Sequence, residues 1–402
     1  MRRDHYTIFS PGKIGPLIVP NRLVRSATWD PSILKKRQMT DEVVNIYSRV
    51  AEGGVGLIIT GDFSVVPEGM LEQDPPTLGS YDAVQIRGFD RLADVVHSAA
   101  AGCKILAQLS AVHQGVGPSD VSSPFTVERT RPLSTAQIRA FVEGFADTIF
   151  HMREEGFDGV QLFAAHGGML SRFLSPHYNR RTDNYGGSVH NRARIIDEIV
   201  RAARQRVGEF PILIKLNSTD YLPDGIDIHN FPLLANEIAR TGVDAIEVSG
   251  GVWDCLVRTE EELGFRPVPI PSSHTRIQSA DKQSYFLQYV EPLHLPVPII
   301  LVGGNRDVER LEAIVRQDKV QFVSLCRPLI SEPDLPRRWL EGRGSSAADC
   351  ISCNSCLYDM YTRLDRGQPA VVTCLVKRDP QRVKAAQRWL ASWVKENAVH
   401  SG

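Results

Sequence analysis

The chain has 402 residues, 42% of them hydrophobic, which is enough to bury the core of one large domain. Its 46 basic and 47 acidic residues nearly cancel, which excludes nucleic acid and acidic membrane surfaces as the main partner. The first residues lack the apolar run of a signal peptide, and no later run reaches the roughly 18 apolar residues of a membrane span. We therefore expect a soluble cytoplasmic protein.

Eight short aliphatic and β-branched runs recur along the chain, and each is followed by a stretch long enough to form a helix. They cover residues 23–26, 56–60, 104–109, 159–163, 212–216, 245–248, 299–302 and 322–325. Runs such as GLIIT and PIILVGG are apolar without alternation, which is typical of parallel strands that are covered on both faces. None of them leads directly into the G-x-G-x-x-G of a dinucleotide-binding fold.

Caps and glycines mark the helices between these strands. Ser134 and Gln137 have the spacing of a capping box at the start of an amphipathic run, which Gly156 ends before the fourth strand. Three similar helical units, each ending near a glycine that can take a positive φ, are predicted at 41–53, 190–207 and 230–242.

This alternation predicts the α/β class, with one (β/α)8 TIM barrel over residues 1–340. Past residue 340 the alternation of strands and helices stops. A loop with four cysteines and a polar, helical end follow, so residues 341–402 are predicted to form a C-terminal extension.

In a (β/α)8 barrel the active site lies at the carboxyl ends of the strands, so the residues that close each run are site candidates. In chain order these candidates are Ser26, Ala27, Thr28, Trp29, Asp62, Gln108, Phe163, His166, Gly168, Lys215, Gly303, Gly304, Cys326 and Arg327.

The ends of the last two strands have the composition of a phosphate site. Gly303 and Gly304 let the backbone approach an anion, and Arg327 can add a charge-assisted hydrogen bond. An equally good interpretation is that the glycines only turn the chain and that Arg327 pairs with a carboxylate such as Glu332.

Gln108 and Lys215 end buried strands on an inward path, where a polar side chain needs a partner. An isoalloxazine ring offers one, because its pyrimidine edge bonds to an amide and a nearby lysine stabilises the negative charge of the reduced flavin. On their own, these two residues are more often ordinary polar caps of a barrel interior.

Five blocks occur in an order typical of one enzyme family: NRLVRSATWD, GVGLIITGDF, AQLS, GFDGVQLFAAHGGMLSRFLSPHYNRRTDNYGGS and SLCRPLISEPDLP. From Phe9 to Cys374 the chain resembles the old yellow enzyme, or NADH:flavin oxidoreductase, family, in its 2,4-dienoyl-CoA reductase-like branch. The resemblance implies a non-covalent FMN that accepts hydride from NADH or NADPH at N5. It then implies hydride transfer to an electron-poor alkene or related unsaturated acceptor.

By position, the resemblance also assigns cofactor contacts. Backbone contacts to the flavin fall on Ser26, Ala27 and Thr28, the pyrimidine edge on Gln108, and the phosphate on Gly304, Cys326 and Arg327. Lys215 stands where the family more often has an arginine, so it keeps the positive charge but loses the bidentate fork. Asp62 and Gly303 complete the predicted cofactor-binding set.

The sequence FAAHGG departs from the H-x-x-H-G-Y or H-x-x-N-G-Y that many relatives use to hold a substrate carbonyl and supply a proton. Phe163 cannot donate a hydrogen bond, and Gly168 replaces the tyrosine. His166 is therefore the predicted catalytic residue, although it could instead be a satisfied histidine beneath the flavin. We expect an apolar substrate pocket at Trp29, Phe163 and Gly168, and an acceptor other than a simple enone.

Cys350, Cys353 and Cys356 form C-x-x-C-x-x-C, and Cys374 can supply a distant fourth ligand. Larger members of the family carry a [4Fe–4S] cluster just after the barrel, and they also have extra nucleotide-binding domains that we do not expect here. The same four thiolates suit a structural zinc ion, and an empty site is the third interpretation.

Two other functions stay open at this point. An FMN-dependent amine dehydrogenase or demethylase would pass its electrons through the cluster, and a flavin-binding protein with decayed catalytic residues would not turn over. In each case the expected partner is a small molecule, with homo-oligomers allowed and with no role for nucleic acid or membrane.

Overall fold

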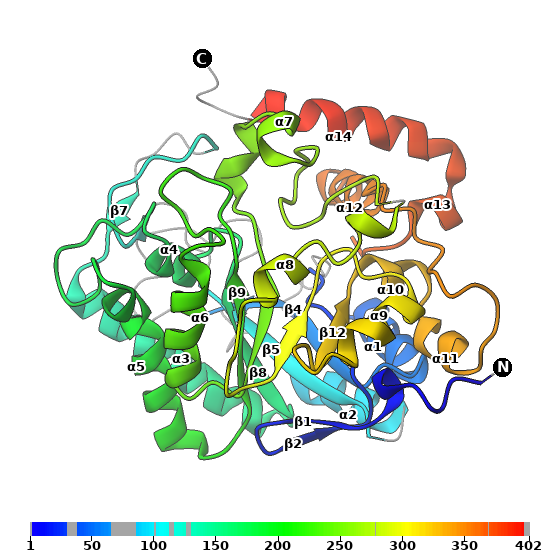
Figure 1. Ribbon diagram of the computed structural model, residues 1–402, viewed down its shortest axis with the longest axis horizontal. Helices are drawn as coiled ribbons and strands as arrows, with labels where there is room; N and C mark the ends of the chain where they lie inside the picture. Colours follow the sequence, from blue (N-terminus) through cyan, green and yellow to red (C-terminus); the bar gives the residue numbers. More distant parts are fainter. Residues whose placement is uncertain are drawn as a thin grey trace.

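The computed structural model describes residues 2–29, 38–65, 86–99, 102–111, 116–125, 130–277, 279–368 and 370–397 (Figure 1). Eight parallel strands close into a barrel in the order β10-β11-β12-β3-β4-β5-β8-β9. In chain order they are β3 (Leu23–Arg25), β4 (Leu57–Ser64), β5 (Lys104–Ser110), β8 (Gly159–Ala164), β9 (Ile212–Asn217), β10 (Ala245–Ser249), β11 (Ile299–Leu301) and β12 (Phe322–Leu325). The predicted TIM barrel and its eight strands are confirmed.

Helices surround the barrel (Figure 1). The longer ones are α1 (Asp41–Glu52), α2 (Phe89–Ala99), α3 (Thr135–Glu154), α5 (Val189–Val207), α6 (Phe231–Arg240) and α9 (Val308–Val315). The predicted capping box starts α3, since Ser134 Oγ accepts from the Gln137 N–H at 3.2 Å and the Gln137 side chain accepts from the Ser134 N–H at 2.9 Å. Each of these helices packs an apolar stripe against the strands.

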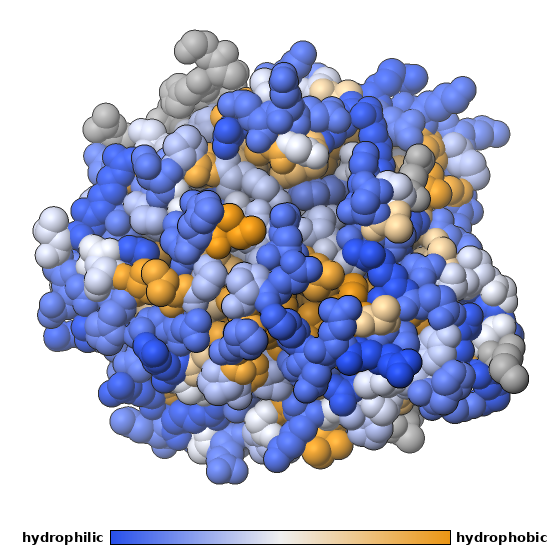
Figure 2. Space-filling view, viewed as in Figure 1, coloured by the Kyte–Doolittle hydropathy of each residue, from blue (hydrophilic) through white to orange (hydrophobic). Residues whose placement is uncertain are grey.

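Shorter elements fill the connections between strands and helices. They are α4 (Met169–Leu174), α7 (Glu260–Leu263), α8 (Leu287–Val290), α10 (Arg327–Ser331), α11 (Leu335–Leu340), β6 (Val116–Gly117) and β7 (Arg131–Pro132), with 3-10 turns at Thr7–Phe9, Trp253–Val257, Ala280–Lys282 and Pro380–Arg382. Within the described ranges, no helix is both long and apolar enough to span a membrane. The face seen in Figure 2 is mostly hydrophilic, with apolar residues in small separate patches.

A hairpin of β1 (Gly12–Ile14) and β2 (Leu17–Val19) closes the amino-terminal end of the barrel. Its buried side chains Ile14 and Val19 belong to the same apolar cluster as the barrel residues Leu57, Leu106 and Phe322. The sequence analysis missed this hairpin because strands of three residues show too little alternation to be recognised.

The barrel interior changes from apolar to polar toward the carboxyl ends of the strands. Above the apolar layer lies a buried polar layer made of Ser26, Gln108, Gln161, Lys215 and Glu247. Side chains of this kind are stable inside a barrel only when they are hydrogen-bonded to one another or to a ligand. This layer is therefore the floor of the functional site.

The C-terminal extension folds back over the same end of the barrel (Figure 1). It contains α12 (Ser355–Asp365), α13 (Leu375–Arg378) and α14 (Val383–Asn397), and α14 is the predicted terminal helix. In α14, Trp393 stacks on Phe125 with ring centroids 6.0 Å apart. The domain boundary at residue 340 stays a prediction.

Candidate functional site

A cavity of about 380 Å³ lies at the carboxyl ends of the barrel strands. Every residue that the sequence analysis assigned to cofactor binding lines it: Ser26, Ala27, Thr28, Asp62, Gln108, Lys215, Gly303, Gly304, Cys326 and Arg327. Trp29, Phe163 and His166 also line this cavity, whereas Gly168 does not. The chain therefore brings candidates from seven strand ends to one enclosed site.

The floor of this cavity is a connected network of hydrogen bonds. Lys215 Nζ lies 3.0 Å from Glu247 Oε2 and 3.0 Å from Ser26 Oγ. Gln161 Nε2 donates to Glu247 Oε2 at 2.9 Å, and Gln108 Nε2 donates to the side-chain oxygen Oε1 of Gln161 at 2.7 Å. Burial disfavours the charged form of Glu247, but the Lys215 ammonium outweighs it and lowers the pKa of that carboxyl.

These contacts leave the upper side of the floor free to bind a ligand. An ammonium has three N–H groups, and the structure uses two of those on Lys215. Gln108 also keeps an amide oxygen that has no hydrogen-bond partner among the described residues. A donor beside an acceptor at the cavity floor fits the pyrimidine edge of a flavin. The sequence analysis missed Gln161 and Glu247, the residues that hold this floor together.

One end of the cavity carries two guanidinium groups with no carboxylate partner among the described residues. Arg327 donates to the His274 carbonyl at 2.9 Å and to Asn354 Oδ1 at 2.6 Å. Arg306, which the sequence analysis missed, donates to Ser352 Oγ at 3.1 Å and to the Ile277 carbonyl. Two cations that face a cavity without a counter-charge suit a phosphate group.

The alternative interpretation of Arg327 as the partner of Glu332 is wrong. Glu332 Oε1 pairs instead with Arg338 Nη2 at 3.0 Å, outside the lining of the cavity. The charge of Arg327 is therefore available to a ligand.

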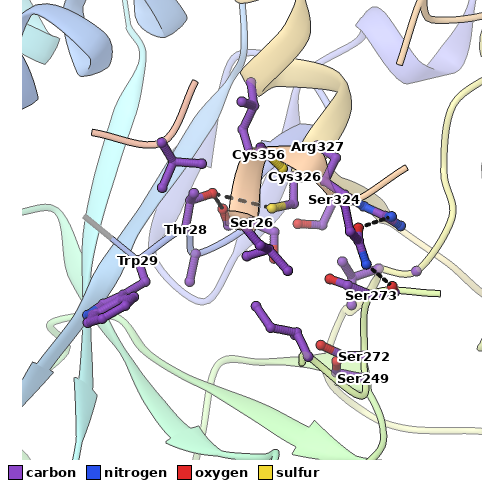
Figure 3. Close-up of a pocket in the computed structure, with 18 of the residues that line it drawn as sticks. Ser26, Thr28, Trp29, Ser249, Ser272, Ser273, Ser324, Cys326, Arg327 and Cys356 are labelled. Atoms are coloured by element: carbon purple, nitrogen blue, oxygen red, sulfur yellow. Dashed lines mark hydrogen bonds between the residues drawn. The ribbon is translucent and has the colours of Figure 1, made fainter. Parts of the chain in front are cut away.

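Gly303 and Gly304 connect β11 to the end of the cavity that carries Arg306 and Arg327. The backbone at both positions favours glycine over any other residue. Their φ angles are 105° and 75°, in the region that other residues rarely adopt. A Cβ atom would lie 2.6 Å from the Phe286 ring at Gly303 and 2.8 Å from the Tyr285 ring at Gly304. In Figure 3, Cys326 faces Thr28, and its sulfur lies 3.4 Å from Thr28 Oγ1.

The His166 ring has both nitrogens in hydrogen bonds. Nδ1 lies 3.1 Å from the Gly251 carbonyl oxygen, which can only accept, so the ring proton is on Nδ1. Nε2 therefore accepts from the Ser249 hydroxyl at 3.2 Å. Burial, together with the Lys215 charge, lowers the pKa of His166 to about 3, so the ring is neutral at neutral pH.

This arrangement favours the second interpretation of His166, a satisfied histidine beneath the cofactor. To donate to a substrate, the ring would have to give up its bond to Gly251 or Ser249. A catalytic role for His166 stays a prediction.

Phe163 takes the place where many relatives have a polar residue, and it packs close to His166 with ring centroids 5.6 Å apart. Gly168 lies behind this ring, since a Cβ there would come 3.3 Å from two carbons of Phe163. Phe163 therefore presents an apolar surface to the cavity, and Gly168 makes room for its ring.

The C-terminal extension supplies a wall of the cavity that the sequence analysis did not predict. Leu357, Met360 and Tyr361 of α12 line it, and the Tyr361 ring lies 6.4 Å from that of Trp29. Asp62, near the end of β4, also lines the cavity. Its carboxylate accepts from Ser110 Oγ at 2.9 Å, and burial of Asp62 raises the pKa of this carboxyl. The site is thus polar at its floor and at one end, and apolar where α12 covers it.

All four clustered cysteines lie beside this site. A second cavity of about 140 Å³ is lined by Cys350, Cys353, Cys356 and Cys374. Cys350 and Cys356 line both cavities and therefore lie at the boundary between them. Among the described residues, no three cysteine, histidine or acidic side chains converge closely enough for one metal ion. Burial raises the pKa of Cys356 well above its ordinary value.

The fold and the cavity define a TIM-barrel protein with a site at the carboxyl ends of its strands that suits a phosphate-bearing ligand. A profile of the NADH:flavin oxidoreductase / NADH oxidase family matches residues 7–345. The chain belongs to this family, which confirms the resemblance to old yellow enzymes.

Individual relatives agree with this assignment. The NADH oxidase of Thermoanaerobacter brockii is 30% identical over 364 residues, which cover 86% of this chain but only 52% of that protein. The NADH-dependent flavin oxidoreductase iliE of Hypocrea jecorina is 30% identical over 355 residues, 80% of this chain and 85% of that one. The chain thus spans about half the length of the first of these relatives.

The solved structure of a 2-naphthoyl-CoA reductase complex has the same fold. Its TM-score to this chain is 0.77 at 23% identity, and the match covers 95% of this chain and 58% of that one. A structure of morphinone reductase gives a TM-score of 0.64 at 22% identity, with 86% and 92% covered.

Proposed function

We propose that this protein is an FMN-dependent oxidoreductase that uses NADH or NADPH to reduce an electron-poor unsaturated acceptor. The observation that carries the proposal is one cavity with a hydrogen-bonding floor at Gln108 and Lys215 and, at its end, two guanidinium groups that have no carboxylate partner among the described residues. A flavin ring requires the first feature and its phosphate the second.

In this proposal the residues that line the cavity hold FMN by its two ends. Gln108 and Lys215 bind the pyrimidine edge of the ring, while Arg306, Arg327 and the backbone at Gly304 bind the phosphate. When bound, FMN supplies hydride transfer between the nicotinamide and the acceptor. The protein's own residues orient the ring and exclude water from one face of it.

The acceptor follows from the apolar side of the cavity. Phe163 stands where many relatives have a hydrogen-bond donor to a substrate carbonyl. Met360 offers an apolar contact, and the rings of Tyr361 and Trp29 offer flat ones. Among the relatives, one is named a cinnamate reductase and one structure is a complex of 2-naphthoyl-CoA reductase with 2-naphthoyl-CoA. These names support an aromatic or conjugated acid derivative as the acceptor, in place of a simple enone.

The test is an anaerobic spectrum of the purified protein, taken before and after each nicotinamide. We expect flavin absorption that NADH or NADPH bleaches, and recovery of the colour when cinnamoyl or naphthoyl derivatives are added. Turnover of cyclohexenone should be at least about 100-fold slower than that of a two-donor old yellow enzyme, because one such donor contributes this much.

Different results would point elsewhere. A correctly folded protein that takes up no FMN would refute the proposal. Bleaching by an amine without nicotinamide would instead support the amine dehydrogenase, and tight FMN without steady-state turnover would support the decayed binding protein.

We further propose that the cavity between Cys350, Cys353, Cys356 and Cys374 holds a [4Fe–4S] cluster. All four thiols line one space, and four cysteine thiolates are the usual ligands of such a cluster. All seven cysteines are free of disulfides, which supports a reducing, cytoplasmic location.

Iron analysis and the visible spectrum test the cluster directly. Protein purified without oxygen should contain about four iron atoms per chain and absorb broadly beyond the flavin bands. The Cys353→Ser variant should lose most of this iron, whereas Cys103→Ser, which changes a buried cysteine far from the cluster in sequence, should keep it. Zinc in place of iron would contradict the cluster.

A further inference from the structure

Glu247 is a fully buried acid inside the barrel that neither the sequence pattern nor the family resemblance singled out. It lies directly opposite Lys215 in the parallel register of β9 and β10. Its Oε2 atom accepts from Lys215 and Gln161 at 3.0 and 2.9 Å, and Oε1 accepts from Ser26 at 2.9 Å. Both carboxylate oxygens are therefore held by this network.

This contact changes the charge that the cavity floor presents. Lys215 lines the cavity, and Glu247 lies below it without lining the cavity. A buried ammonium and a buried carboxylate at 3.0 Å form a pair with no net charge. A lone cation at this position would stabilise the reduced cofactor, because the reduced ring gains negative charge close to the cation. A neutral ion pair stabilises the reduced cofactor much less.

We propose that Glu247 is a positioning residue that neutralises Lys215 beneath the cofactor and so keeps the reduced flavin a strong hydride donor. The inference rests on the proposed FMN function and says how that function is tuned. Because the reduced state gains less stabilisation from the protein, hydride leaves it more readily.

The rest of the site is consistent with such tuning. Phe163 gives no hydrogen bond to an acceptor, and both ring nitrogens of His166 are already engaged, so the protein does little to activate the acceptor. Driving force must then come from the donor side. The site thus suits conjugated acceptors that are harder to reduce than polarised enones.

The midpoint potential of bound FMN tests this inference. Glu247→Gln keeps the shape and most of the hydrogen bonds but leaves the Lys215 charge uncompensated. At about pH 6 we expect the variant to favour reduced over oxidised FMN at least tenfold more than the wild type does. For this two-electron couple, tenfold corresponds to a shift of about 30 mV to more positive potential.

Two further variants serve as controls. Glu247→Asp keeps the charge and should have nearly the wild-type potential. The double variant Lys215→Gln with Glu247→Gln removes both charges together, so it buries no unpaired ion and should also stay close to the wild type.

Two results would overturn the inference while leaving the FMN function intact. One is a Glu247→Gln potential equal to that of the wild type. The other, which remains measurable even if Glu247→Gln fails to fold, is a double variant whose potential is more negative than that of the wild type by about 30 mV or more, because Lys215 would then act as a lone cation in the wild type. If the wild-type protein binds no FMN, the proposed function itself fails.

Discussion

The Arg327→Met variant is expected to bind FMN about 100-fold more weakly than the wild type. Within the described part of the chain, Arg327 hydrogen-bonds to a carbonyl and an amide oxygen and pairs with no carboxylate, so its charge is available to the phosphate. Truncating one partner of a hydrogen-bonded charge pair costs about 2 to 5 kcal/mol, and roughly 2.7 kcal/mol is a factor of 100. Methionine keeps most of the apolar stem and so limits the loss of packing.

Riboflavin gives the matched ligand for this experiment because it has the same ring but no phosphate. Titration by fluorescence should show the FMN affinity falling and the riboflavin affinity unchanged. Arg310→Ala removes a nearby guanidinium that does not line the cavity, so it should alter neither affinity. An equal loss for both ligands in Arg327→Met would mean that Arg327 supports the shape of the site and not the phosphate.

The sequence was sufficient to predict the barrel and the cavity-lining residues at seven of its strand ends, for a simple physical reason. In a parallel barrel every strand ends at the same edge, so finding the apolar runs also finds the residues that meet there. Gln108 and Lys215 come near the end of such runs, and Gly303 directly follows one. Their convergence needed no knowledge of the register between strands.

Residues whose role depends on register or on distant contacts could not be predicted in this way. Glu247 sits in the middle of AIEVS, where an inward and an outward glutamate look the same until β9 is placed beside β10. Arg306 follows the glycines by only two residues, but only the three-dimensional structure shows that no carboxylate in its described ranges pairs with this guanidinium.

Dependence on distant contacts also explains why the hydrogen bonds of His166 and the cavity wall formed by α12 were not predicted. The hydrogen-bonding state of His166 depends on the carbonyl of Gly251, which comes from a different strand end. Met360 and Tyr361 form a wall of the cavity because the C-terminal extension folds back over the barrel. No local sequence pattern predicts where a terminal segment packs. Long-range packing of this kind is decided by whole surfaces, which a single sequence does not display.

A buried carboxylate ties the helices of that wall together. Asp359 of α12 is fully buried and pairs with three arginines: Arg363 at 3.3 Å, Arg382 at 3.4 Å, and Arg378. It thereby ties α12 to α13 and to the turn that precedes α14.

Asp359→Asn should therefore loosen the whole extension. Removing one side of a buried pair costs about 3 to 5 kcal/mol, and we expect roughly 2 to 3 here because each arginine is about one-third exposed to solvent. Hydrogen exchange in α12 and α14 should accelerate about 30- to 150-fold, since each 1.4 kcal/mol is a factor of ten. Asp365→Asn, at the exposed end of the same helix, is the matched control and should leave exchange unchanged.

Asp359→Asn should affect acceptor binding and FMN binding differently. Met360 and Tyr361 follow Asp359 on α12 and line the side assigned to the acceptor, whereas Gln108 and Lys215 belong to the barrel floor. Asp359→Asn should thus raise the KM for the acceptor while the FMN affinity stays within about threefold of the wild type. If FMN affinity falls as far as acceptor binding, the extension holds the cofactor as well, and the division of the cavity into a barrel floor and an extension wall is wrong.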